Sequence, residues 1–80
     1  MQERRAEPRF VSDESGCITL DEHTQIACLV HDFSLGGVKI TLPDASRVPN
    51  TFLLTAPPLE GIKVCQIVWR SDEMIGAQFR

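Results

Sequence analysis

Alternation of apolar and polar residues is the feature that most restricts how this chain of 80 residues can fold. The three-to-four-residue spacing of an amphipathic helix is nearly absent, whereas Val38-Lys39-Ile40-Thr41-Leu42 alternates as a half-buried strand does. Such runs predict six strands, at residues 16–20, 25–30, 38–42, 51–56, 62–70 and 75–79. Residues 25–30 are apolar on both faces, as in a central strand, and Cys65, Ile67 and Trp69 share one face of their strand.

Turn-forming residues separate the six predicted strands. The five intervening segments, rich in glycine, proline, serine and acidic residues, are 21–24, 34–37, 43–50, 57–61 and 71–73. Residues 43–46 could form one helical turn, and no longer helix is expected. This pattern predicts an all-β fold, an antiparallel barrel or sandwich with little or no helix. A closed barrel would also remove exposed strand edges.

Composition and charge narrow the class of protein. The chain is 42% hydrophobic and 24% charged, which is ordinary for a globular domain, and its length suits a single domain over residues 1–80. Its formal charge of −3 disfavours binding to nucleic-acid polymers. We expect no membrane association, because the chain has no basic amphipathic segment, no signal peptide, and no apolar run longer than 26–30.

The charge is unevenly distributed along the chain. The first ten residues carry three arginines against two glutamates, whereas the other seventy carry five basic and nine acidic side chains. A proline at position 8 favours extended backbone in this first segment. We therefore divide the domain into a flexible, arginine-bearing arm at 1–14 and a β-barrel at 15–80.

Neither catalysis nor metal binding is predicted. Ser34, His31 and Asp32 are close in sequence, but neighbours on a strand point to opposite faces, and no nucleophile motif is present. Cys28 and His31 form a lone C-x-x-H, whereas structural zinc sites usually show two close pairs of ligands. The odd number of cysteines predicts three reduced, largely buried thiols in a cytoplasmic protein.

The arm carries groups that suit a phosphorylated ligand. Arg5 and Arg9 form an R-x-x-x-R motif, and their planar guanidinium groups could bind phosphates bidentately and stack on purines. Arg4 immediately precedes the motif. A chain with six arginines is expected to show about 0.4 such matches by chance, so this motif alone is weak.

A second motif, D-x-S-x-x-G, lies where a predicted strand runs into a turn. It uses Asp32, Ser34 and Gly37, and its chance expectation in this composition is only about 0.02 matches. Asp32 and Ser34 could bond the turn backbone or present acceptors and a hydroxyl to a ligand. Gly36 and Gly37 are expected to permit positive φ and close approach to the backbone.

An R-x-x-x-R arm followed by D-x-S-x-x-G in a six-stranded β domain resembles the PilZ family, whose members are bacterial receptors for the second messenger cyclic di-GMP. The similarity includes the last two predicted strands, around 68–70 and 75–79, and spans essentially the whole chain. The resemblance implies a six-stranded antiparallel β-barrel with an extended N-terminal arm. It also implies a receptor with no enzymatic activity, no metal and no cofactor, only the ligand.

The resemblance also implies roles for the motif residues. Arg5 and Arg9 clamp the phosphates and guanines of the ligand, Asp32 and Ser34 meet a guanine from the barrel surface, and Gly37 lets the ligand lie close to the backbone. These roles agree with the chemistry of guanine, which offers acceptors to an arginine fork and N–H donors to a carboxylate.

Two further expectations follow from the family. PilZ-like proteins with arginine at the position of Arg4 often bind an intercalated dimer of cyclic di-GMP, which implies two ligand molecules per chain. Binding would order the arm onto the barrel and signal in trans to an effector protein that the sequence does not identify.

Two alternatives remain open. The first is a PilZ-like adaptor that binds only proteins, as members with degenerate motifs do, although both motifs are complete in this chain. The second is a small OB-like or cold-shock-like barrel for single-stranded nucleic acid. Such barrels present aromatic stacking platforms, whereas most of the five aromatic residues of this chain lie where a core would need them.

Overall fold

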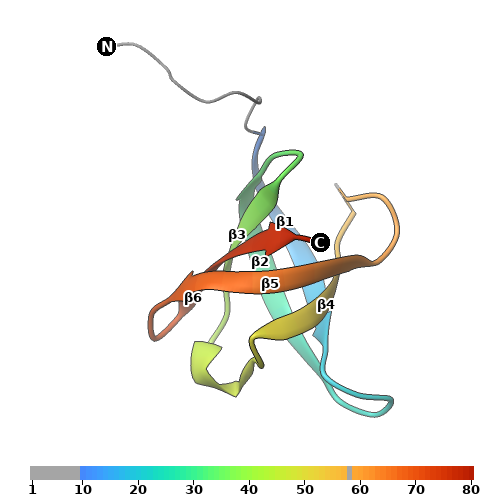
Figure 1. Cartoon of the computed structure of the whole chain (residues 1–80), viewed down its shortest axis with the longest axis vertical. Coiled ribbons are helices and arrows are strands. Elements are labelled where there is room, and N and C mark those ends of the chain that lie inside the picture. Colours follow the sequence, from blue (N-terminus) through green and yellow to red (C-terminus); the bar gives the residue numbers. More distant parts are fainter. Residues whose placement is uncertain (1–9, 58) are drawn as a thin grey trace.

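The chain folds into a closed barrel of six antiparallel strands, arranged around the barrel in the order β1-β2-β3-β6-β5-β4 (Figure 1). The structure is a computed structural model that describes the backbone of residues 10–57 and 59–80 and the side chains of residues 14–57 and 59–80. The predicted all-β barrel is therefore confirmed, and closure leaves none of the six strands with an unpaired edge.

All six predicted strands are present, and five of them lie within a few residues of their expected positions. They are β1 (Phe10–Thr19), β2 (Gln25–Phe33), β3 (Gly37–Thr41), β4 (Thr51–Thr55), β5 (Lys63–Arg70) and β6 (Met74–Phe79). The largest difference is in β1, which begins at Phe10 rather than at residue 16. Residues 10–14, which the sequence analysis assigned to the arm, therefore belong to the barrel.

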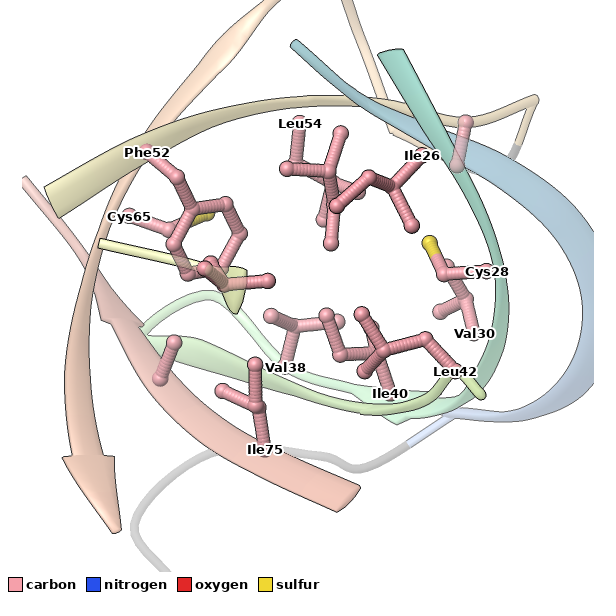
Figure 2. Close-up of a cluster of buried hydrophobic side chains, with 14 of the residues drawn as sticks. Ile26, Cys28, Val30, Val38, Ile40, Leu42, Phe52, Leu54, Cys65 and Ile75 are labelled. Carbon is pink, nitrogen blue, oxygen red and sulfur yellow. The ribbon is translucent and has the colours of Figure 1, made fainter. Parts of the chain in front are cut away.

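The core fills the inside of the barrel with one buried face from each of its strands (Figure 2). Its fully buried members include Ile18, Val30, Ile40, Leu54 and Ile75, contributed by five different strands. Burial of aliphatic side chains of this size stabilises the fold by about 1.5–3 kcal/mol each. Alternate side chains along the regular parts of the strands therefore point into the core or out to solvent.

Residues 25–30 are apolar on both faces, which suggested a central strand, but β2 buries only one of these faces. From Gln25 to Val30 the strand alternates between exposed and buried positions, and Leu29 is 42% exposed. The reason is geometric: a small barrel has one interior, so even its most apolar strand has only one face to bury.

A short 3₁₀ turn, η1 (Ala45–Arg47), closes one end of the barrel, where the sequence predicted at most one helical turn. Asp44 caps it, because its carboxylate accepts hydrogen bonds from the backbone N–H and the hydroxyl of Ser46, and these bonds lower its pKa. The Arg70 guanidinium donates to the carbonyl oxygens of Ala45 and Val48 at 2.8 and 2.7 Å and so ties η1 to β5.

The three cysteines are free thiols, as the sequence analysis expected. Cys28 and Cys65 are buried in the core, whereas Cys17 is half-buried. Burial raises the pKa of Cys28 to about 11 and that of Cys65 to about 12. Both core cysteines are therefore neutral, small apolar side chains at neutral pH.

Candidate ligand site on the outer face of the barrel

One extra residue in β2 brings Asp32 to the outside of the barrel. In the pairing of β2 with β3, Val30 is opposite Ile40 and Asp32 is opposite Lys39, so His31 is inserted as a β-bulge. Uninterrupted alternation would carry the inward face of Val30 on to Asp32. Because of the bulge, Asp32 instead shares the outer face with Lys39.

A second extra residue does the same for Trp69 in β5. Ile67 pairs with Ala77 and Trp69 pairs with Gly76, so Val68 is inserted between them as a bulge. Ile67 packs against the core, but Trp69 is 45% exposed. The prediction that Cys65, Ile67 and Trp69 share one face is therefore wrong, because counting by two along the sequence cannot detect the bulge.

The two bulges align four side-chain positions across four neighbouring strands. Asp32 of β2 is opposite Lys39 of β3, Lys39 is opposite Gly76 of β6, and Gly76 is opposite Trp69 of β5. These positions form a row on the outer face, which we call the outer row. The row places a carboxylate and an ammonium at one end and an indole at the other, with no side chain between them at Gly76.

A cleft of about 260 Å³ lies over the outer row. It is lined by Asp32, Phe33, Ser34, Gly37, Val38, Lys39, Val68, Trp69, Gly76 and Ala77. The cleft is therefore bordered by the D-x-S-x-x-G motif and by the last two strands, β5 and β6. An open cleft with an aromatic wall and a few polar groups suits a planar, partly charged ligand.

An ion pair between Lys39 and Asp32 lies in the cleft. The Lys39 Nζ lies 3.9 Å from the Asp32 carboxylate, with exposed side-chain fractions of 39% and 17% respectively. The lysine end of the pair is half-exposed, so solvent screens the attraction, and the pair contributes on the order of 0–1 kcal/mol to stability. An ammonium can also pair with a phosphate, and a carboxylate can accept from an N–H donor.

Two glycines allow close contacts at the cleft. A Cβ at Gly37 would lie 2.6 Å from the carbonyl oxygen of Ala77 on the paired strand, and a Cβ at Gly76 would overlap the Trp69 indole. This close neighbour of Gly37 is the paired strand, and the expected approach of a ligand to Gly37 stays a prediction. Positive φ at Gly36 and Gly37 is not observed, because among the described residues only Gly61 has it, at 65°.

The turn that carries the motif is fixed by hydrogen bonds. Ser34 donates its backbone N–H to the Gly37 carbonyl at 2.9 Å, and its hydroxyl accepts from the Gly36 N–H at 3.2 Å. The Gly36 carbonyl accepts from the backbone N–H of Phe79 at 2.9 Å. The turn is thus held both by its own serine and by the end of β6.

The structure brings together part of the predicted site. Asp32, Ser34 and Gly37 line the cleft, and Gly36 lies in the same turn. Arg4, Arg5 and Arg9 lie outside the described residues.

Sequence reasoning missed seven of the ten lining residues, among them Lys39, Val68, Trp69 and Gly76. The available signals were the single tryptophan of the chain and a lysine in the middle of an apolar strand. Neither signal indicates a site until the pairing of β3, β5 and β6 is known.

Two structural findings concern other classes of site. No group of three or more histidine, cysteine, aspartate or glutamate side chains in the described part of the chain is placed to hold a metal ion. Within residues 10–57 and 59–80, no helix is long and apolar enough to cross a membrane.

The fold and its outer cleft define a small β-barrel binding domain, and comparison with known proteins gives its family. A model of the PilZ domain matches residues 3–80, and the chain therefore belongs to the PilZ family, which consists of receptors rather than enzymes. Among solved structures, the chain is similar to a PilZ domain of YcgR from Escherichia coli, described with c-di-GMP. The two share 17% sequence identity and a TM-score of 0.69, over 96% of this chain and 78% of that chain. No curated protein matches the chain significantly in sequence.

Proposed function

We propose that this chain is a receptor for cyclic di-GMP, which it holds between the R-x-x-x-R arm and the cleft at the D-x-S-x-x-G turn. The observation that carries the proposal is the outer row, which brings the motif aspartate, a lysine and an exposed indole to one cleft. Membership of the PilZ family and the similar fold of the YcgR domain support the same ligand.

Each end of the outer row suits one part of this ligand. The Asp32 carboxylate can accept hydrogen bonds from the N1–H and N2 amine of a guanine, which adenine does not offer in the same arrangement. Trp69 offers a face on which a purine can stack, worth about 1–3 kcal/mol. Lys39 supplies a positive charge for a phosphate.

The course of β1 supports the assignment of the arm. Phe10, the first described residue, pairs with Phe33, which follows Asp32 directly. Arg9 directly precedes Phe10 in the sequence. Arg5 lies five positions before Phe10, so even a fully extended chain places the two residues at most about 18 Å apart. Both motif arginines are therefore within reach of the cleft by chain length alone.

Titration calorimetry with cyclic di-GMP tests the proposal. Arg5→Ala and Arg9→Ala should each raise Kd by a factor of about 100, since each removes a bidentate, charge-assisted contact. Arg47→Ala, which removes an arginine from η1, is the matched control and should bind as the wild type does. Quenching of Trp69, the single tryptophan, provides a second readout.

Three outcomes would contradict the proposal. If Arg5→Ala and Arg9→Ala bind as tightly as Arg47→Ala, the arm is not the clamp. If cyclic di-AMP, which has the same phosphates, binds as tightly as cyclic di-GMP, the Asp32 assignment fails. A chain that binds neither dinucleotide would correspond to the protein-only adaptor.

The stoichiometry tests the role of Arg4. We propose two ligand molecules per chain, with Arg4 contributing to the second. Wild-type calorimetry should then give a ratio of two, and Arg4→Leu should reduce it to one. A ratio of one in both proteins would remove Arg4 from the site.

We further propose that the receptor acts in the bacterial cytoplasm and signals in trans to a partner protein. The three free thiols suit a reducing compartment.

A further inference from the structure

A second groove lies at the end of the barrel opposite the ligand cleft. The β2–β3 turn and the β1–β2 turn are joined by the full length of β2, and they lie at the top and bottom of Figure 1. The groove has a volume of about 370 Å³ and lies between the β1–β2 turn and the start of β4. Its lining includes Leu20, Asp21, Glu22, Pro49, Phe52 and Leu53.

The groove has an apolar floor that continues along the outer face. Leu53, which is 38% exposed, is opposite Val64, which is 39% exposed, and Ile62 lies two residues before Val64 with 66% of its surface exposed. The three side chains extend the floor from β4 across to β5. Exposed aliphatic side chains adjoining a groove are typical of a surface that contacts another protein.

One lip of the groove is acidic. Asp21 and Glu22 both line it, and its lining contains no lysine or arginine. The Asp21 carboxylate accepts a hydrogen bond from the backbone N–H of His23 at 2.8 Å, which fixes its place in the turn and lowers its pKa. The Asp21 carboxylate is therefore ionised at neutral pH.

We propose that this groove binds a basic amphipathic segment of a partner protein, with apolar side chains on the Leu53–Val64 floor and lysine or arginine beside Asp21 and Glu22. Charge complementarity decides the occupant, because two carboxylates at an apolar groove disfavour an acidic segment and favour a basic one. The groove thereby offers the proposed trans partner a surface distinct from the ligand cleft.

The test uses the full chain, labelled with ¹⁵N, and a synthetic amphipathic peptide of leucine and lysine. Chemical-shift changes should be confined to residues 19–22, 51–53 and 62–64. An analogue with glutamate for lysine should bind at least about tenfold more weakly, because it cannot pair with the two carboxylates. An analogue with serine for leucine should be weakened as much, because it cannot bury apolar side chains on the floor. Shifts centred on residues 32–37 would overturn the proposal, as would equal binding of the three peptides.

Matched variants separate the groove from general electrostatics. Asp21→Asn with Glu22→Gln keeps the oxygen that accepts from His23 but removes both charges, and it should raise the peptide Kd by about five- to tenfold. Asp72→Asn with Glu73→Gln removes the same charge from the β5–β6 turn and should bind as the wild type does. If the two double variants weaken binding equally, the groove is not the site.

A second pair of variants tests the floor. Leu53→Ser should weaken peptide binding, whereas Leu29→Ser, at an outward position of similar exposure on β2, should not. A concentration-dependent dimer in sedimentation that Leu53→Ser abolishes, without any peptide shift, would assign the groove to a second copy and overturn the proposal. The groove variants should bind cyclic di-GMP as the wild type does. Peptide binding therefore tests the groove, and cyclic di-GMP binding tests the receptor assignment, independently of each other.

Discussion

Strands β4 and β5 are paired neighbours in the barrel, yet they use their residues differently. β4 alternates without interruption over five residues, and its inward side chains, Phe52 and Leu54, are almost fully buried. β5 begins the same way with buried Cys65, but its bulge at Val68 then turns Trp69 outward. Strand segments with regular alternation contribute every second side chain to the core. A bulge reverses the order, so that the next side chain in the series lies on the outer surface.

Strand β2 shows the same division within one element. Its first half contributes Ile26, Cys28 and Val30 to the core by strict alternation. After the bulge at His31, Asp32 lies on the outer face opposite Lys39. In β2 and β5, the end of the strand that carries the extra residue is therefore the end that lines the cleft.

Deleting one residue from each of the two paired strands would test this contrast most severely. Without Leu53, either Phe52 or Leu54 must leave the core, which should cost about 4 kcal/mol and unfold a domain of this size at ordinary temperature. Deletion of Val68 removes only the bulged residue and keeps Ile67 inside and Trp69 outside, so the cost should be about 1 kcal/mol.

Urea unfolding followed by circular dichroism measures both deletions. Equal destabilisation by the two would show that β4 and β5 do not differ in the way described. A folded Leu53 deletion with native stability would contradict the assignment of β4 to the core.

The two glycines of the cleft provide the next test, because one faces backbone and the other faces a side chain. Gly37→Ala sets a methyl group against the Ala77 carbonyl oxygen, 2.6 Å away, and should cost about 2 kcal/mol in thermal or urea unfolding. A melting temperature equal to that of the wild type would show that the paired strands are not in such close contact.

Gly76→Ala meets only the exposed Trp69 ring, which can move away, and should cost about 1 kcal/mol. Displacement of the indole should alter the tryptophan emission and raise the Kd for cyclic di-GMP about tenfold. Unchanged emission and affinity would exclude Trp69 from the proposed site.

The smallest expected effect is that of Lys39→Gln on stability. Its side chain is half-exposed and its ammonium lies 3.9 Å from the Asp32 carboxylate, so the free energy of unfolding should change by less than about 0.5 kcal/mol. Affinity for cyclic di-GMP should fall with a reduced salt dependence if the ammonium contacts a phosphate. A large loss of stability would instead make Lys39 a structural residue.

The contrast between regular and bulged strands also explains which features could be predicted from the sequence. The six strands and five turns are local properties, visible in alternation and turn residues, and they were predicted within a few residues, β1 excepted. A bulge is a property of two paired strands, since one extra residue leaves local composition unchanged. Trp69 was therefore placed on the face of Cys65, and the outer positions of Lys39 and Gly76 became visible only with the pairing known.

The outer row joins strands that are far apart along the chain, and this has a consequence for biosynthesis. Lys39 and Gly76 are directly opposite each other but separated by 37 positions in sequence. A chain emerging from the ribosome would display the D-x-S-x-x-G turn long before β6 provides the floor beside it. A ligand at the proposed site therefore requires a chain whose β6 has already paired with β3.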